Sequence, residues 1–381
     1  MKLYVEKDAH AWNSVVEGSQ HSAWHHMYES FAFEKRKQSL PLVVEEGKNR
    51  LLFPYSLKSF LGFKRASVPI YDYASVLPNN PEAIPLLPKA LDVTLHVLED
   101  LEVDLLTISA PFFMPEDYLQ IMDTWFEKRD AFANTIFVDA LCTRDKSLEE
   151  IWMNGFSKHA RNRARKADKE GVNVHEIRAL EEWISDMYFC NMSSFYRQSR
   201  YPRYPHSDKE AFLAYLKWHK ELLGESCRIY GASIQDRLIA YMVTLEFNRL
   251  IVITLLMSLS EFLPKCPNDA LLRHLIDHAC QDKFEWVCYS FDRSSYHSER
   301  RGLFSSLRRF KFEHGFEEHP MKIYFLGLTG AGRLLQQLGG IYDWLFVAGS
   351  NLPYFLTDTL QKIYERRKYR KSKYKYITHD L

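Results

Sequence analysis

The chain has 381 residues, more than a single compact core usually needs, so its length favours two domains or one duplicated domain. Hydrophobic residues make up 46% of the sequence and charged residues 26%, a composition that excludes an intrinsically disordered chain and is typical of a globular protein. The formal net charge is +1, so any attraction to nucleic acid or to a membrane has to come from local patches.

Cysteine spacing and the beginning of the chain indicate the compartment. The six cysteines form no CxxC pair and no zinc-like spacing, which disfavours a disulfide framework and a structural metal and fits a reducing compartment. Residues 1–10 contain Glu6, Lys7 and Asp8 where a signal peptide would have an apolar run, and no stretch of 18 apolar residues occurs in the sequence. We therefore expect a cytoplasmic protein.

The first half of the chain reads as a complete α/β unit. The aromatic-rich residues 11–36 predict a helix, and alternating apolar and polar residues then predict a meander of three strands, Leu40–Glu45, Arg50–Ser56 and Lys64–Pro69. A helix, a short apolar strand, a second helix and a last strand follow, over residues 81–99, 103–108, 115–129 and 133–139.

The second half repeats this order. It begins with a predicted helix, Ser147–Glu170, that Gly171 ends, followed by a strand at 173–177 and by helices on both sides of the turn Pro202–Pro205. A second meander is predicted at Cys227–Ser233, Leu238–Glu246 and Leu250–Met257. The order helix, strand, helix, strand then returns at 268–283, 286–290, 299–314 and 319–326.

The lengths of the connections predict how the strands pair. Strands joined by short turns are antiparallel, and a strand, helix, strand step gives a right-handed parallel crossover. The sequence therefore predicts two mixed sheets in tandem, in residues 1–145 and 146–328, with the active cleft between them. Residues 329–381 are expected to form a helical tail whose second part, Arg366 to Lys375, is basic and could contact the inner membrane surface peripherally.

The most informative segment runs from Pro267 to Gly315. The predicted strand at 286–290 ends in Phe291-Asp292-Arg293-Ser294, and the turn after a buried strand is where ligands usually meet an α/β sheet. Farther on, Phe310-Lys311 precedes Gly315-Phe316, which puts a lysine on the last turns of a predicted helix. A structural reading stays open, because Lys311 could complement the helix dipole and Arg293 could cap a turn.

This segment resembles the Fem-type (FemAB-like) aminoacyl and acyl transferases, a group built from tandem GNAT-like domains. The family's strand ends in Phe-Gly-Arg-Ser, followed by a glycine, Phe-Lys and Gly-Phe. The matching residues here are Phe291–Ser294, Gly302, Phe310-Lys311 and Gly315-Phe316. Trp152 with residues 157–167 resembles a second block, and residues 67–73, which close on Asp72-Tyr73, resemble a third. Asp292 stands where the family has glycine, which leaves the substrate class open.

The resemblance implies a fold, a reaction and residue roles. The fold would be α/β, with two tandem GNAT-like (acyl-CoA N-acyltransferase-like) domains that contain mixed sheets. The reaction would be attack of an amine on an ester or thioester carbonyl, by an N-acyltransferase or aminoacyltransferase with a phosphate-bearing or cell-envelope-related acceptor. Lys311 would stabilise the oxyanion, and Asp72 and Asp292 would compete to accept the amine proton. The residues expected to bind substrate are Lys158, Arg161, Tyr73, Tyr196 and Arg293.

The identity of the acyl donor stays open. Aminoacyl-tRNA, acyl-CoA and acyl carrier protein are the candidate co-substrates, and no other cofactor is expected. Residues 258–267 contain no glycine, which disfavours the glycine-rich turn with which GNAT enzymes hold the pyrophosphate of CoA. A phosphate-bearing partner such as tRNA would suit one face of the predicted basic helix, although a solvated face is an equal reading. That face carries Lys158, Arg161, Arg165 and Lys169.

Other kinds of function remain as alternatives. A non-catalytic GNAT-like protein could use the basic helix and the tail to bind RNA or an anionic membrane, with salt-dependent association. His274 and His278 have the spacing of zinc ligands but lack a visible third ligand, so a metal site is disfavoured. Ser294, Ser295 and His297 lie too close together in sequence to form a catalytic triad.

Overall fold

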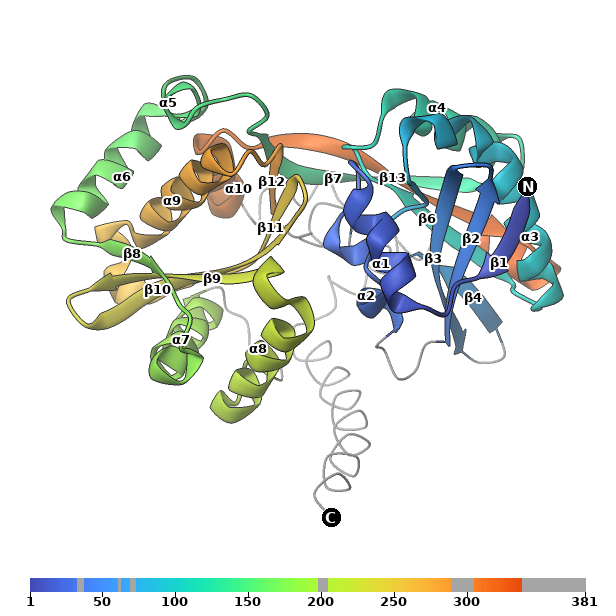
Figure 1. Ribbon diagram of the computed structural model, residues 1–381. Helices are drawn as coiled ribbons and strands as arrows, with labels where there is room; N and C mark the ends of the chain where they lie inside the picture. The colour runs from blue at the N-terminus through green and yellow to red at the C-terminus, as the bar shows by residue number, and fades with distance from the viewer. Residues whose placement is uncertain (33–37, 61–62, 69–72, 198–204, 290–304, 338–381) are drawn as a thin grey trace, which may run out of the picture.

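The computed structural model describes residues 1–32, 38–60, 63–68, 73–197, 205–289 and 305–337. Two lobes stand side by side, and two long strands, β7 and β13, run between them (Figure 1). The elements of the first lobe, in chain order, are β1 (Lys2–Val5), α1 (Ala9–Gly18), η1 (Trp24–His26), α2 (Tyr28–Ala32), β2 (Gln38–Glu46), β3 (Asn49–Phe60), β4 (Phe63–Ser67), β5 (Leu77–Pro78), η2 (Pro81–Leu86), α3 (Leu87–Asp100), β6 (Leu105–Ala110), α4 (Glu116–Glu127) and β7 (Phe132–Cys142).

The second lobe contains most of the remaining elements, and its last strand returns to the first lobe. These elements are α5 (Leu148–Glu150), the π-helix η3 (Ile151–Gly155), α6 (Lys158–Lys169), β8 (Asn173–Glu176), α7 (Leu180–Arg197), α8 (Lys209–Leu223), η4 (Gly224–Ser226), β9 (Cys227–Ile234), β10 (Arg237–Phe247), β11 (Leu250–Ser258), η5 (Ser260–Lys265), α9 (Pro267–Gln281), β12 (Trp286–Tyr289), α10 (Ser305–Glu313) and β13 (Glu317–Gly327).

The strands form one continuous mixed sheet rather than the two separate sheets predicted. Its order is β1-β2-β3-β4-β6-β13-β7-β12-β11-β10-β9-β8, and β5 pairs with β3 at the side. Both meanders are antiparallel, as predicted. The predicted parallel crossovers occur where β4 pairs with β6 and where β11 pairs with β12.

The two halves are joined because β7 and β13 are interleaved. Direct parallel pairing was expected for β6 with β7 and for β12 with β13. Instead, β13 lies between β6 and β7 and is antiparallel to both: Ile323 is opposite Ser109 on one side and Asn134 on the other. In turn, β7 lies between β13 and β12, with Ala140 opposite both Glu317 and Cys288. Each crossover thus spans one strand from the other half.

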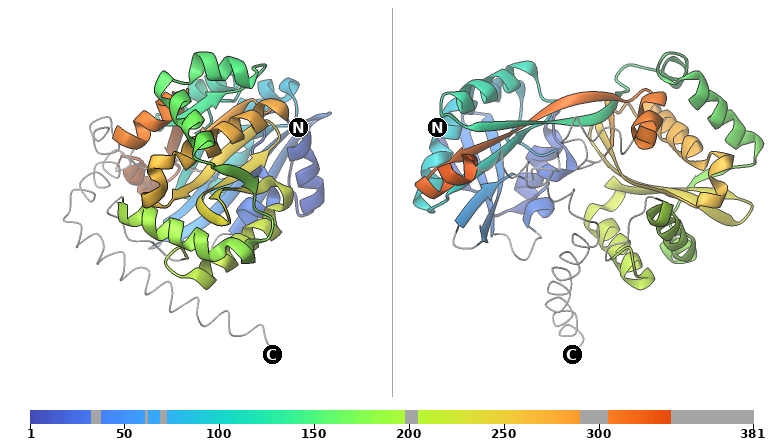
Figure 2. Two further views of the ribbon diagram at one scale, coloured as in Figure 1. Left: turned by 90° about the vertical axis from the view of Figure 1, so that its left-hand side faces the viewer. Right: turned by 180° about the vertical axis from the view of Figure 1, so that it is seen from behind.

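Helices cover both faces of this sheet (Figures 1 and 2). In the first lobe, α3 and α4 bury residues such as Leu91 and Phe126 against one face, while α1 buries Trp12 and Val16 against the other. In the second lobe, α9 packs on the sheet between α6 and the strands, and α7 lies across β10 and β11 on the opposite face. A third group of buried residues, which includes Tyr73, Val138 and Cys288, fills the junction between the lobes.

Two predicted helices are interrupted. The helix expected at 11–36 consists of α1, η1 and α2, because Ser19 leaves the helical conformation with φ −88° and ψ 129°. The helix expected at 147–170 breaks at Phe156, where a β-bridge to His314 forms, and Ser157 then caps a new helix by accepting a hydrogen bond from the amide of Ala160. The strand β1 was not predicted. Gly171 ends α6 as expected, with φ +75°.

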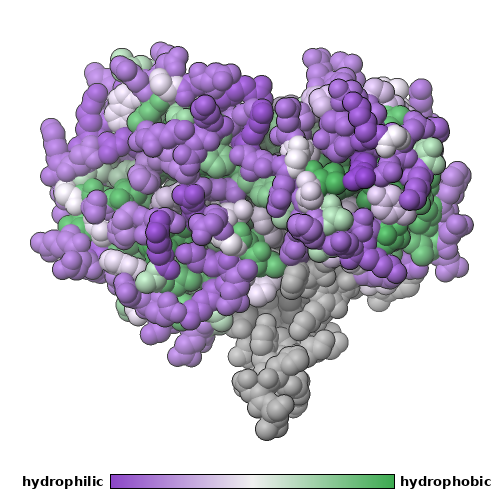
Figure 3. All heavy atoms as spheres, viewed as in Figure 1, coloured by the Kyte–Doolittle hydropathy of each residue, from purple (hydrophilic) through white to green (hydrophobic). Residues whose placement is uncertain are grey.

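Hydrophilic residues dominate the face shown in Figure 3, and the outline is notched between the two lobes. Within the described ranges, none of the helices combines the length and the apolar character needed to cross a bilayer. The predicted basic tail from Arg366 to Lys375 lies outside these ranges.

Candidate functional site at the junction of the two lobes

Lys311 is buried in an ion pair that connects α10 with β7. Its side chain is about 5% exposed, and Nζ lies 2.6 Å from Oδ2 of Asp139. The same nitrogen lies 4.6 Å from the centre of the Tyr289 ring, close enough for a cation–π contact. Lys311 therefore has a specific partner, and its role goes beyond complementing the dipole of α10. An ammonium group with three donors in a low-dielectric site is well suited to stabilise an anionic oxygen.

Two tyrosines connect this ion pair to the first lobe. Tyr73 is 1% exposed and has a left-handed backbone, with φ +54°. Its hydroxyl donates a hydrogen bond of 2.8 Å to the carbonyl oxygen of Tyr289, the last residue of β12. The hydroxyl of Tyr289 is buried and has no hydrogen-bond partner within the described ranges. Burial, followed by the charges of Asp139 and Asp269, raises the pKa of Tyr289, so its hydroxyl stays protonated and can donate.

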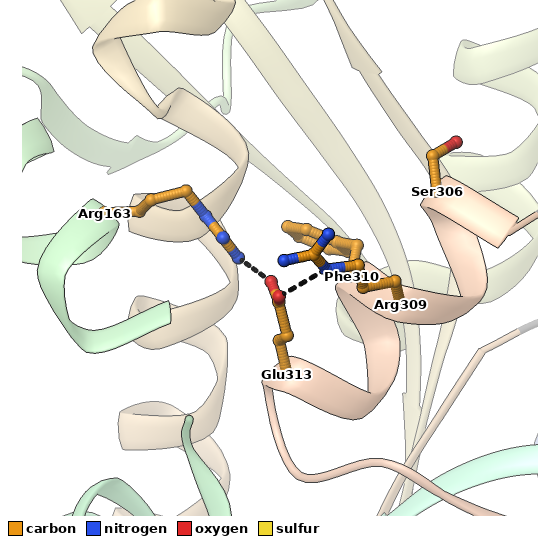
Figure 4. A pocket seen from close by; sticks show the side chains of 5 residues that line it. All are labelled: Arg163, Ser306, Arg309, Phe310 and Glu313. Atoms are coloured by element: carbon orange, nitrogen blue, oxygen red, sulfur yellow. Dashed lines mark hydrogen bonds and ion pairs between the residues drawn. The ribbon is translucent and has the colours of Figure 1, made fainter. Parts of the chain in front are cut away.

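A pocket of about 500 Å³ opens on another side of α10 (Figure 4). Its lining residues Ser306, Arg309, Phe310 and Glu313 recur at three- and four-residue intervals and share one side of the helix, and Arg163 of α6 completes the wall. Lys311 points away from this side, toward Asp139. One helix therefore carries both the buried lysine and the pocket.

Arg163 is the centre of the charge network beside this pocket. Its Nε lies 2.7 Å from Asp269, and its Nη2 lies 2.7 Å from Glu313, which also pairs with Arg309 at 2.8 Å (Figure 4). Burial disfavours the Arg163 cation, but the hydrogen bonds that it donates to the carboxylates of Asp269 and Glu313, together with their negative charges, outweigh burial, so the pKa of Arg163 is raised. The fully buried His314 lies against the same acid, with Nε2 3.2 Å from Oδ1 of Asp269. This network fixes α10, and with it Lys311, against α6 and α9.

Comparison with known proteins identifies the fold. Residues 154–297 match the family model described as the acetyltransferase (GNAT) domain. FemX is similar in structure, with a TM-score of 0.66 at 11% identity over 89% of this chain and 99% of that chain. The chain has a Fem-like GNAT fold. The predicted fold class, with two GNAT-like units in tandem, is therefore confirmed.

The chain is similar in structure to two further proteins. The C-terminal domain of a putative lysylphosphatidylglycerol synthetase from Agrobacterium fabrum has a TM-score of 0.55 at 11% identity, over 86% of this chain and 95% of that chain. L-PGS from Bacillus licheniformis has a TM-score of 0.52 at 11% identity, over 89% and 99%. No curated protein matches the sequence at a significant level. The GNAT match supports acyl transfer as the general class of chemistry, and identities this low show only the fold.

The structure brings some of the predicted site residues together on this GNAT scaffold. Tyr73 and Lys311 meet at Tyr289, but Tyr73 is buried, so its expected contact with substrate stays a prediction. Tyr196 is 62% exposed near the end of α7, and its role also stays a prediction. Asp72, Asp292 and Arg293 lie outside the described ranges. In sequence, Asp72 directly precedes Tyr73, while Asp292 and Arg293 follow Tyr289 by three and four residues.

The basic helix forms as α6, but its predicted stripe is divided. The helix buries three alanines, Ala160, Ala164 and Ala167, and leaves Lys158, Arg165 and Lys169 exposed. Arg161 instead turns toward the chain, where its Nη1 donates to the carbonyl oxygens of Trp152, Met153 and Phe156 at 2.7 to 3.0 Å. Arg161 thus holds the end of the π-helix.

The histidine pair considered as a metal site belongs to a buried network. Nε2 of His278 lies 2.8 Å from Glu246, which also accepts a hydrogen bond from Tyr230. His274 stacks edge-on against the Tyr230 ring. Within the described ranges, no group of three or more potential ligands is placed to hold a metal ion. All six cysteines are free thiols.

Several residues of this site were not identified from the sequence. Asp139 pairs with Lys311, and Asp269 and Glu313 hold Arg163. A weak signal existed for Asp139, because it is a charged residue at the end of an apolar predicted strand. Its partner lies 172 positions away in sequence, so only the interleaving of β7 with the second lobe reveals the pair.

Proposed function

We propose that the protein is an N-acyltransferase or aminoacyltransferase that moves an acyl or aminoacyl group onto an amine of a phosphate-bearing or cell-envelope-related acceptor. The main support is the buried ammonium of Lys311, which pairs with Asp139 and lies over the ring of Tyr289 at the junction of the lobes. The names of the structural neighbours, FemX and a putative lysylphosphatidylglycerol synthetase, agree with aminoacyl transfer to such acceptors.

The proposed reaction begins when the lone pair of a neutral amine attacks the carbonyl carbon of an ester or thioester. The carbonyl electrons move to oxygen, and Lys311 would stabilise this oxyanion while its other contact, to Asp139, stays in place. The tetrahedral intermediate then expels the alkoxide or thiolate of the donor, which takes up a proton as the amine loses one. Asp72 and Asp292 remain the proposed acceptors of the amine proton.

The proposed donors remain aminoacyl-tRNA, acyl-CoA and acyl carrier protein. The exposed residues Lys158, Arg165 and Lys169 of α6, which make no ion pair within the described ranges, are the proposed contact for a phosphate-bearing substrate. The same surface supports the second candidate function, non-catalytic binding of RNA or of an anionic membrane. In that case association would weaken steeply with salt, and no acyl product would form.

The test of the proposal is mass spectrometry of products formed by the full-length protein from the three donor classes and pools of cell-envelope amines. We expect a new amide whose mass exceeds that of its acceptor by one acyl group. The Lys311→Met variant should form it at least about a hundredfold more slowly, since loss of one oxyanion donor typically has that effect. Lys322→Met is the control, because Lys322 forms a half-exposed ion pair with Asp123 on α4.

Two outcomes would contradict parts of this proposal. Unchanged turnover in Lys311→Met would exclude the oxyanion role of Lys311. The absence of any acyl product, combined with salt-sensitive binding of RNA or anionic vesicles, would favour the binding protein over the enzyme.

A further inference from the structure

The hydroxyl of Tyr73 links the first lobe to the end of β12 in the second. The pairing of β7 with β12 ends at Cys288, which lies opposite Ala140, and Tyr289 is the last residue of β12 and lies beyond that pairing. The hydroxyl of Tyr73 donates a hydrogen bond of 2.8 Å to the carbonyl oxygen of Tyr289. A side chain of the first lobe therefore holds the end of this strand at the point where its pairing with β7 stops.

Tyr73 is itself held tightly by its surroundings. It is 1% exposed and belongs to the buried group that also contains Val138 and Cys288. The centre of its ring lies 6.2 Å from the ring of Phe113 and 6.3 Å from the ring of His25. Its backbone is left-handed, with φ +54°, a conformation that crowds the Cβ of any residue other than glycine. Such strained residues persist where the surrounding structure enforces them, and they cluster at functional sites.

Tyr289 transmits this constraint to Lys311. Nζ of Lys311 lies 4.6 Å from the centre of the Tyr289 ring and 2.6 Å from Oδ2 of Asp139. The ammonium group has three N–H donors, and Asp139 occupies one of them. The aromatic ring restricts the directions that remain for the other two. A displacement of the Tyr289 ring would therefore turn these donors away from the place where an oxyanion has to be stabilised.

We propose that Tyr73 is a positioning residue, whose hydroxyl fixes the end of β12 and, through the ring of Tyr289, the direction of the Lys311 ammonium. The first lobe in this way sets the geometry of a lysine that the second lobe contributes. A misplacement of about 1 Å can lower a rate by about a hundredfold, so a single hydrogen bond at this point affects the reaction. The catalytic consequence rests on the proposed function, whereas the control of the position of Lys311 does not.

Nuclear magnetic resonance of the full-length protein, labelled with carbon-13 at Cε of lysine, measures the position of Lys311 without reference to activity. Lys311 lies over the face of the Tyr289 ring, so the ring current should shift its Cε protons upfield of those of exposed lysines. Lys311→Met assigns this signal by its loss. Tyr73→Phe keeps the ring and removes one hydroxyl, and we expect it to move the signal toward those of the exposed lysines.

Tyr118→Phe is the matched control. Tyr118 is a fully buried tyrosine of the same lobe, and its hydroxyl donates to the carbonyl oxygen of Val76 at 2.9 Å, a hydrogen bond that stays within the first lobe. Its loss should lower the free energy of unfolding as Tyr73→Phe does, but leave the Lys311 signal in place. Tyr289→Leu removes the ring and should move the signal to the position of the exposed lysines. An unmoved signal in Tyr289→Leu would overturn the proposal even if Tyr73→Phe failed to fold.

Kinetic measurements show what this position contributes to the reaction. Tyr73→Phe should lower kcat by about tenfold or more and leave KM within about twofold of the wild type, because it changes the direction of Lys311 and not the binding of the substrate. An unmoved Lys311 signal in folded Tyr73→Phe overturns the proposal, and so does a moved signal with an unchanged kcat. A moved signal in a protein that transfers no acyl group supports the control of Lys311 by Tyr73 and contradicts only the proposed function.

Discussion

Nζ of Lys311 and Oδ2 of Asp139 lie 2.6 Å apart, and the two side chains are 5% and 16% exposed. Removing one member of a buried pair leaves an uncompensated charge, whereas replacing both with apolar residues is often neutral for stability. Asp139→Leu should therefore lower the free energy of unfolding by about 3 kcal/mol, and adding Lys311→Met should recover most of that loss. Urea denaturation measures both effects.

A measurement of acyl transfer separates the chemical role of Lys311 from its contribution to stability through the ion pair with Asp139. The double variant Asp139→Leu with Lys311→Met should be stable and still inactive, because it lacks the ammonium that would stabilise the oxyanion. Wild-type turnover in that stable double variant would show that the ion pair serves folding alone.

Local sequence patterns predicted most of the elements, because alternation and helical periodicity are set by which face of each element is buried. They predicted both meanders and the parallel pairs β4–β6 and β11–β12. They did not predict that β13 separates β6 from β7, since that pairing depends on residues about 200 positions apart, such as Ile323 and Ser109. The break at Phe156 was missed for the same reason, because the β-bridge to His314 is a distant contact.

The site was predictable only where a motif stood out. Lys311 and Tyr73 were identified through a family resemblance, and both lie at the junction of the lobes. The residues that hold them, Asp139 and Tyr289, had no local signal strong enough to single them out. The predicted basic stripe did not include Arg163, and this arginine of α6 is the one that pairs with Asp269 and Glu313.

Arg163 and Arg309 both pair with Glu313, which allows the contributions of a half-buried and an exposed arginine to stability to be compared. Both pair with Glu313, but the Arg163 side chain is 32% exposed and also holds the buried Asp269, whereas Arg309 is 71% exposed. Arg163→Gln should lower the free energy of unfolding by about 3 kcal/mol because it leaves Asp269 without its cation. Arg309→Gln should cost less than about 1 kcal/mol, as exposed ion pairs do. Equal losses in denaturant titrations would contradict this hierarchy.

Gly315 is required for a close backbone approach as well as for its backbone angle. It has φ +82°, and a Cβ there would lie 3.1 Å from Cα of Gly155. Gly171 has a similar φ of +75°, but a Cβ there would meet nothing within 4 Å. Gly171→Ala should therefore cost only the left-handed strain of about 1–2 kcal/mol. Gly315→Ala should cost clearly more, since α10 would also have to move away from the π-helix. Matching unfolding free energies for the two variants would show that the contact with Gly155 is unimportant.

His26 should make the free energy of unfolding of the protein depend on pH in the acidic range. Its ring is completely buried, Nε2 accepts a hydrogen bond of 3.0 Å from the amide of Ser75, and Nδ1 lies 3.2 Å from the carbonyl oxygen of Ala23. If the ring were charged, Nε2 would carry a proton and would face the N–H of Ser75, so that two donors would oppose each other. Burial lowers the pKa of His26 to about 3, below the ordinary value of 6.5.

The sign of the effect follows from linkage. Between pH 6.5 and about pH 3, the unfolded chain binds a proton on this histidine that the native ring cannot accept. The free energy of unfolding should therefore fall with decreasing pH across this window, by up to about 1.4 kcal/mol per unit from His26. His26→Gln, although less stable at neutral pH, should show a slope between pH 6 and pH 4 that is shallower by that amount. The control His159→Gln, at an exposed position of α6, should keep the wild-type slope. A His26→Gln slope equal to that of the wild type would show that His26 binds its proton equally well in the native and unfolded states, which would contradict the lowered pKa of the buried ring.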